Sequence, residues 1–99
     1  MSPTFSVAAR AAREYAKLGP QDRARFTRAR IAFVEALRVD PSALPPNLRV
    51  KRVTGHDGIW ELTWAADGRA TFEYGAEQVA GEPHVCWRRI GSHSIFSDP

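Results

Sequence analysis

The segment WRRIGSHSIF, residues 87–96, brings side chains suited to phosphate chemistry close together. Two arginines, Arg88 and Arg89, precede a Gly-Ser pair that we expect to form a tight turn, and His93 follows that pair. Cleavage of RNA without a metal requires a base for the 2′-hydroxyl, an acid for the leaving 5′-oxygen, and cations for the phosphorane. Histidine suits either proton-transfer role because its ordinary pKa is about 6.5. His93 is therefore a candidate for this chemistry, against the alternative of an incidental surface histidine.

Further basic residues recur on the segments that precede this one. Arg49 and Lys51 occupy alternate positions in LRVKRV, and Arg69 follows an Asp-Gly turn signal. If these segments are neighbouring strands, their cations converge with Arg88 or Arg89 on a sheet face that no helix covers. Such a face suits a phosphodiester backbone. The alternative is that basic residues on edge strands only protect the sheet against aggregation.

Charge and composition limit the class of protein. The 99 residues include 14 Lys and Arg against 11 Asp and Glu, a net charge of +3, so a polyanion is a reasonable partner. With 43% hydrophobic and 25% charged residues, residues 1–99 are expected to form one globular domain. No apolar run approaches the ~20 residues of a membrane helix, and the start lacks the apolar core of a signal peptide. These features predict a cytoplasmic protein without membrane contact.

Residues that bind metals are sparse. The single cysteine, Cys86, excludes an internal disulfide, and the three histidines have no metal-site spacing. We predict that the protein uses no metal and no other cofactor. His84 and Cys86 fall in an expected strand and carry no predicted chemistry.

The elements that must position these residues begin with two helices. Residues 3–7 indicate a short first strand, and residues 8–18 and 20–39 have helical periodicity. Gly19 suits the end of the first helix and Pro20 suits the first turn of the second, which predicts an antiparallel helix pair. Three prolines within residues 40–46 then require a loop.

After the loop the hydrophobic period changes to two, as in strands. LRVKRV, IWELTWA, ATFEYG and HVCWRRI are the expected strands, with a GHDG turn and an Asp-Gly hairpin turn among their connections. The sequence therefore predicts an α+β domain, in which two N-terminal helices pack on one face of an antiparallel β-sheet meander. The aromatic residues of the alternating face are expected to be core rather than a surface for base stacking; they are Trp60, Trp64, Phe72 and Tyr74.

The stretches LRVKRVTGHDGIWELTW, DGRATFEY and WRRIGSHSIF resemble, in order and spacing, the RelE/ParE superfamily of bacterial type II toxin–antitoxin toxins. The resemblance extends from about Phe5 to the end and is most specific over residues 49–98. It implies a RelE-like fold and a small basic toxin that a cognate antitoxin silences, in a complex that could bind operator DNA through the antitoxin. RelE-like members cut mRNA in the ribosomal A site, whereas ParE-like members inhibit DNA gyrase without cutting anything.

The resemblance also implies roles for individual residues. The basic strand residues of the RelE branch match Arg49 or Lys51, its later arginine matches Arg69, and its C-terminal turn residue matches His93. Phe96 matches the C-terminal aromatic. Several relatives have arginine in place of His93 and tyrosine near Phe96, so the sequence is more similar to YafQ-like members, whose Gly-Thr-His turn precedes a phenylalanine.

The leading hypothesis is a metal-independent, ribosome-dependent mRNA endonuclease that inhibits translation. His93 is expected to be the general acid, with Lys51 and Arg69 as cations at the reacting phosphate. The general base stays open among Asp67, Lys51 and His56. The expected RNA contacts are Arg49, Arg88, Arg89 and Phe96. The alternatives are a gyrase inhibitor without catalytic residues and a degenerate member that only sequesters antitoxin or has a structural role.

The positive charge also indicates a protein partner. We expect an acidic antitoxin that covers the basic sheet face or packs along the helices. An exposed apolar margin at Val7, Ala11 and Ile31 could accept an amphipathic helix.

Overall fold

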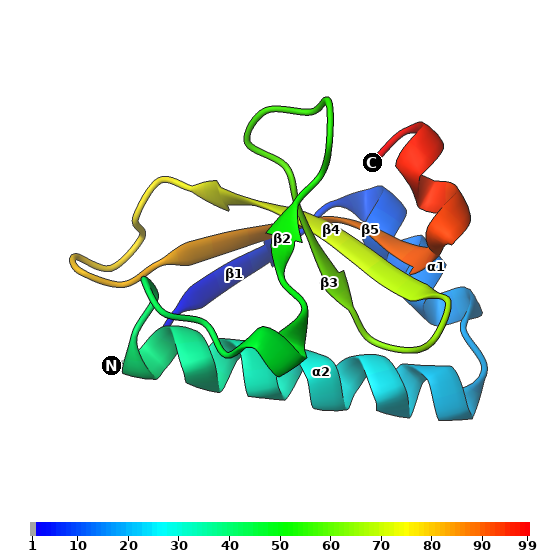
Figure 1. Ribbon diagram of the computed structural model, residues 1–99, viewed down its shortest axis with the longest axis horizontal. Helices are drawn as coiled ribbons and strands as arrows, with labels where there is room; N and C mark the ends of the chain where they lie inside the picture. The colour runs from blue at the N-terminus through cyan, green and yellow to red at the C-terminus, as the bar shows by residue number, and fades with distance from the viewer. Residues whose placement is uncertain (1) are drawn as a thin grey trace.

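The chain folds as a short strand and two helices, followed by four more strands (Figure 1). The computed structural model describes residues 2–99. The first half contains β1 (Thr4–Val7), α1 (Ala9–Lys17) and α2 (Pro20–Val39). The second half contains η1 (Pro46–Leu48), β2 (Lys51–Arg52), β3 (Trp60–Thr63), β4 (Gly68–Gly75), β5 (His84–Ser92) and η2 (His93–Ser97), where η denotes a 3-10 helix. Within residues 2–99, neither α-helix combines the length and apolar composition that crossing a membrane requires.

The five strands form one sheet in the order β1-β5-β4-β3-β2. Strands β2 to β5 make the predicted antiparallel meander, and the predicted α+β class is confirmed. The predicted first strand is also present, but it pairs parallel to β5, with Thr4 opposite His84 and Val7 opposite Trp87. The sheet is therefore mixed, a feature that strand periodicity does not reveal because it arises from residues 80 positions apart.

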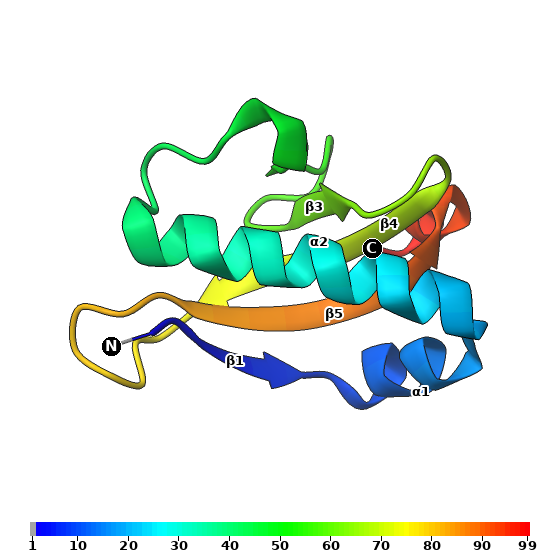
Figure 2. The same ribbon diagram turned by 90° about the horizontal axis from the view of Figure 1, so that it is seen from below.

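The core lies between α2 and one face of the sheet. Figure 2 shows α2 across the middle of the sheet, with β1 and α1 to one side. The ring of Phe33 lies 4.9 Å from that of Phe72, and Phe26 lies 5.5 Å from Trp87, as centroid distances. The core prediction is confirmed for Phe72 and Trp64, which are 0% and 9% exposed. The prediction is wrong for Tyr74, which is 40% exposed because it lies at the end of β4, near the edge of the packed layer.

Helix α1 occupies the edge of the sheet, just beyond the end of β1. Its Tyr15 ring packs against Phe26 of α2 at 5.9 Å, and Ala11 is fully buried in the core. The prediction that Ala11 belongs to an exposed apolar margin is therefore wrong, because α1 turns this residue toward the sheet. Val7 and Ile31 are exposed as predicted, at 44% and 56%. The chain reverses at Gly19, so α1 and α2 run in roughly opposite directions (Figure 2).

The strand predicted over LRVKRV is shorter than expected. Pro46 begins a 3-10 turn, and Arg49 ends it in the left-handed conformation with φ 54°. Proline suits the start of such a turn because its φ is already restricted, whereas a left-handed residue cannot continue a strand. Only Lys51 and Arg52 pair with β3, so Arg49 lies outside the sheet.

The Gly91-Ser92 pair is not the predicted turn but the end of β5. Gly91 pairs with Arg69 and Ser92 with Gly68, and the chain changes direction one residue later, at His93. A side chain at position 91 would place its Cβ 2.9 Å from Cγ2 of Ile95. Glycine is needed here because η2 folds back directly over the strand.

Gly68 offers a direct test of close packing in the β3–β4 hairpin. A Cβ at position 68 would lie 2.5 Å from the indole of Trp64, which is only 9% exposed. Gly68→Ala is expected to lower the free energy of unfolding by about 1–3 kcal/mol, as overpacking typically does. Urea denaturation measures this loss. Gly19→Ser is the control, because a Cβ at position 19 meets no atom within 4 Å. Equal stability of the two variants would contradict the prediction.

Candidate functional site

His93 begins η2 at the point where β5 ends beside the β3–β4 loop. The backbone N–H of His93 donates a hydrogen bond to Oδ1 of Asp67 at 3.3 Å. Its ring Nδ1 lies 4.0 Å from the same oxygen, and the two side chains are 65% and 73% exposed. The structure thus brings the predicted acid and one of the three predicted bases together.

The remainder of η2 holds His93 in place. Ser92 caps the turn by accepting a hydrogen bond from the Ser94 N–H at 3.3 Å. Ile95 is 2% exposed and anchors the turn to the sheet. The rings of Phe96 and His93 pack edge to face, with their centroids 5.1 Å apart and their planes at 84°. Phe96, expected to contact RNA, thus lies directly beside His93.

Arg69 is buried rather than displayed on the open face of the sheet. The residue is 8% exposed, and its Nη1 donates to the backbone oxygens of Ala65, Ala66 and Gly68 at 3.2, 3.3 and 2.9 Å. The guanidinium therefore binds the loop that carries Asp67. This contact could not be predicted from the sequence, because it depends on how the loop backbone curls.

The prediction that Arg88 and Arg89 are free cations on the sheet is wrong, because each lies against a carboxylate. Arg89 pairs with Glu14 of α1 at 2.8 Å and donates to the backbone oxygen of Asp98 at 2.8 Å. Arg88 lies 3.5 Å from Glu73 and donates to the Pro99 oxygen at 3.3 Å. Acids distant in the sequence therefore neutralise both arginines, and local spacing contains no signal for them.

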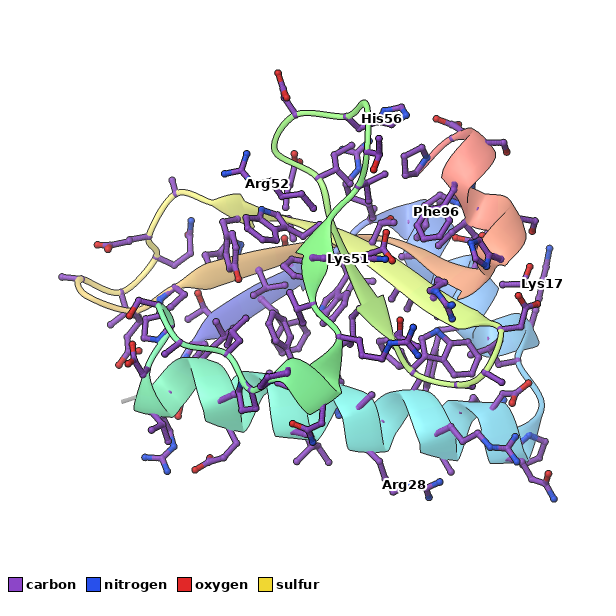
Figure 3. The ribbon with its side chains drawn as sticks, in the orientation of Figure 1. Lys17, Arg28, Lys51, Arg52, His56 and Phe96 are labelled. Atoms are coloured by element: carbon purple, nitrogen blue, oxygen red, sulfur yellow. The ribbon has the colours of Figure 1, made fainter. Side chains whose placement is uncertain are left out.

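Lys51 remains accessible on the face of the sheet opposite α2. Its Nζ lies 3.8 Å from Oε1 of Glu61, and the lysine side chain is 68% exposed whereas that of Glu61 is 9% exposed. Figure 3 shows Lys51 pointing from β2 across the sheet in the direction of η2. Its neighbour Arg52 instead lies over the Trp60 ring at 5.1 Å.

Two other predicted residues, His56 and Arg49, lie on segments other than the one that carries His93. His56 is exposed on the loop between β2 and β3, whereas Phe96 is on η2 (Figure 3). Arg49 is exposed at the end of η1. Asp67 is therefore the base candidate that the structure places in contact with His93.

Two hollows on the surface bear on binding. One, of about 440 Å³, is lined by the loop containing Asp67, by Trp64 and Ser92, and by the Asp22–Arg25 pair of α2. The second, of about 420 Å³, is mainly apolar and lies between β1, α1 and α2. We name it the apolar groove; its lining includes Phe5, Val7, Tyr15, Phe26, Thr27 and Arg30.

Unpaired positive charge is concentrated on the helices. Among residues 2–99, five helical cations have no carboxylate within 4.0 Å: Arg13, Lys17, Arg23, Arg28 and Arg30. Figure 3 shows Arg28 pointing away from the sheet on the outer side of α2. The helices, more than the sheet, therefore present positive charge to a partner.

Comparison with known proteins identifies the fold. No protein-family model matches the chain, and no curated protein sequence matches it. The solved structure of a YoeB/ParE toxin from Agrobacterium tumefaciens aligns with a TM-score of 0.66, covering 91% of this chain and 98% of that one. The chain has the fold of this toxin. The two sequences are 13% identical, so the alignment supports the predicted RelE-like architecture, and the chemistry depends on the residues described above.

The Glu14–Arg89 pair predicts a dependence of stability on pH. Burial alone would raise the pKa of Glu14, but hydrogen bonds from Arg89 and from the Ile90 N–H outweigh it, and the pKa lies below its ordinary value. Such a carboxylate stabilises the fold above its unfolded pKa of about 4.3, and this contribution is lost as pH falls through the folded pKa.

Glu14→Gln should therefore destabilise the protein at pH 7, and its difference from wild type should shrink toward pH 3. Urea denaturation at both pH values measures the difference. Glu35→Gln removes an exposed pair with Arg38 and is the control, expected to have a smaller effect because water screens that pair. A Glu14→Gln deficit that stays constant with pH would contradict the assignment.

Proposed function

We propose that the protein is the toxin of a type II toxin–antitoxin pair and that it cuts mRNA on the ribosome. The shared fold supports the toxin class. The His93–Asp67 pair, with Phe96 packed on the histidine, supports the nuclease branch. A toxin that only binds gyrase has no use for a histidine–carboxylate pair at this position, so this contact favours cleavage over the gyrase alternative.

In the proposed reaction the 2′-oxygen attacks the adjacent phosphorus while the bond to the 5′-oxygen breaks. The 2′-hydroxyl loses its proton to a base, for which Lys51 and His56 are the remaining candidates. The imidazolium of His93 donates a proton to the leaving 5′-oxygen. Asp67 is assigned to hold the imidazolium, because it already contacts His93. Lys51, whose side chain is 68% exposed, supplies positive charge that the phosphorane requires.

The proposed RNA contacts differ in how readily they can reach a phosphate. Arg49 and Lys51 are exposed, and Phe96 is half-buried beside His93. Arg88 could exchange Glu73 for a phosphate, because both side chains are partly open to water, at 39% and 46% exposure. Arg89 and Glu14 are only 14% and 21% exposed, so separating them costs more. We therefore assign Arg88 to RNA and Arg89 to the fold.

His93→Gln tests the proposed acid. Loss of general acid–base catalysis typically costs about 10²–10⁴-fold, and we expect a decrease in cleavage of ribosome-bound mRNA in that range. Primer extension on programmed ribosomes measures the rate. His84→Gln is the control, because His84 lies at the start of β5, at the opposite end of that strand from His93, and it should cleave at close to the wild-type rate.

Cleavage by His93→Gln at the wild-type rate would contradict the proposal and leave His93 with a structural role in η2 only. Mapping of 5′ ends in cells that express the wild type separates the two functions. Intact mRNA accompanied by gyrase-linked DNA breaks would establish the gyrase alternative.

The apolar groove is the proposed binding site for the antitoxin. Phe5 and Val7 are 61% and 44% exposed there, although both are large apolar residues. Arg30 lines the groove, and Arg23 lies on the same stripe of α2, two turns earlier. An apolar groove with cations at its margin matches an acidic amphipathic helix.

Val7→Glu should weaken antitoxin binding by at least ten-fold, because it places a carboxylate in the apolar groove and repels an acidic partner. Isothermal titration with the product of the neighbouring gene measures the affinity. Ile31→Glu makes the same change on an exposed helical position outside the groove lining and is the control. Equal affinities of the two variants would place the antitoxin elsewhere.

A further inference from the structure

The loop between β3 and β4 is held together by hydrogen bonds to the backbone oxygens of Ala65, Ala66 and Gly68. The Trp64 N–H donates to the Gly68 oxygen at 3.0 Å, and the Gly68 N–H donates to the Ala65 oxygen at 3.1 Å. Both acceptors also receive a hydrogen bond from Arg69 Nη1, which reaches the Ala66 oxygen as well. One guanidinium nitrogen thus connects three backbone oxygens of the loop.

We infer that Arg69 is a positioning residue, which places His93 by fixing the loop that carries Asp67. This inference rests on the proposed function, in which His93 is the acid. Asp67 lies between Ala66 and Gly68, whose oxygens Arg69 binds on either side. The carboxylate of Asp67 in turn accepts the His93 N–H and lies beside its ring. The contacts therefore run without a gap from Arg69 to the imidazole.

The burial of Arg69 supports this role. At 8% exposure the residue offers little surface to an approaching phosphate, in contrast to Lys51. The residue opposite Arg69 on β5 is Gly91, which has no side chain to compete for the space. Three converging carbonyl oxygens carry partial negative charge, and a charged donor satisfies them better than a neutral one. The guanidinium of Arg69 is therefore directed at the backbone of the loop and away from solvent.

Positioning and direct phosphate binding have different consequences. A phosphate ligand contributes to RNA affinity, and its removal reduces the salt dependence of binding by about 0.7 in log–log slope for single-stranded RNA. A positioning residue changes the placement of the acid, so its loss lowers kcat and leaves KM and the salt slope unchanged. A misplacement of about 1 Å can cost 10²-fold in rate.

The test is a double-mutant cycle of Arg69→Met and Asp67→Ala, measured as kcat and KM on programmed ribosomes. We expect each single variant to lose at least ten-fold in kcat, and the double variant to lose no more than the worse single, because both act through one contact path. Arg52→Met removes the same charge from an exposed position and is the control, expected to keep kcat. Losses that multiply in the double variant, with a lower salt slope for Arg69→Met, would overturn the inference.

A second measurement does not depend on activity and separates this inference from the proposed function. The imidazole resonances of His93 can be followed by NMR in the free protein. Arg69→Met should shift them in the same direction as Asp67→Ala, and Arg52→Met should leave them unchanged. If Arg69→Met does not fold, Arg69→Lys replaces it and should show a smaller shift of the same sign. A His93 signal that moves in Asp67→Ala but stays in place in the Arg69 variants would overturn the inference, whether or not the wild type cuts mRNA.

Discussion

The packing of α2 across the sheet is the constraint on which the rest of the structure depends. Phe26 and Phe33 enter the aromatic layer formed by Phe72 and Trp87, with centroid distances of 4.9 to 6.0 Å. Loss of one such buried ring typically costs about 3–5 kcal/mol. Because this seam uses one face of β4 and β5, the opposite face of both strands is left to polar residues and to the C-terminal turn.

That opposite face is balanced in charge rather than basic. Glu61, Glu73 and the more distant Glu14 each lie against one cation, and Arg69 is bound by backbone oxygens. A polyanion must therefore compete with resident acids for Arg88, whereas the helices present cations without carboxylate partners. This division is the basis for proposing RNA contact near His93 and an acidic antitoxin along α1 and α2.

The site could be predicted in part because some of its determinants are local. His93 lies two residues after Gly91, which permits a close return of the chain. Phe96 lies three residues further on, so their contact is a property of one short turn. The identity of the general base stayed open among three residues. The contact that singles out Asp67 joins it to His93, 26 positions along the chain, and no local pattern reveals such a contact. Arg69 was expected on an accessible face, since alternation along a strand shows the side of the sheet but not what covers it.

The sequence by itself determined the order of the two α-helices and five strands and part of the core, including Trp64 and Phe72. Helical and strand periods, the Gly-Pro junction and the Asp-Gly hairpin are local signals, and they act through backbone geometry and apolar burial. Only the tertiary structure decided that β1 joins the sheet parallel to β5, that Glu14 neutralises Arg89 across 75 residues, and that Arg69 turns inward to the loop carrying Asp67. These outcomes depend on strand register and on contacts between residues far apart in the sequence. Such contacts form, and contribute to stability, only in the folded chain.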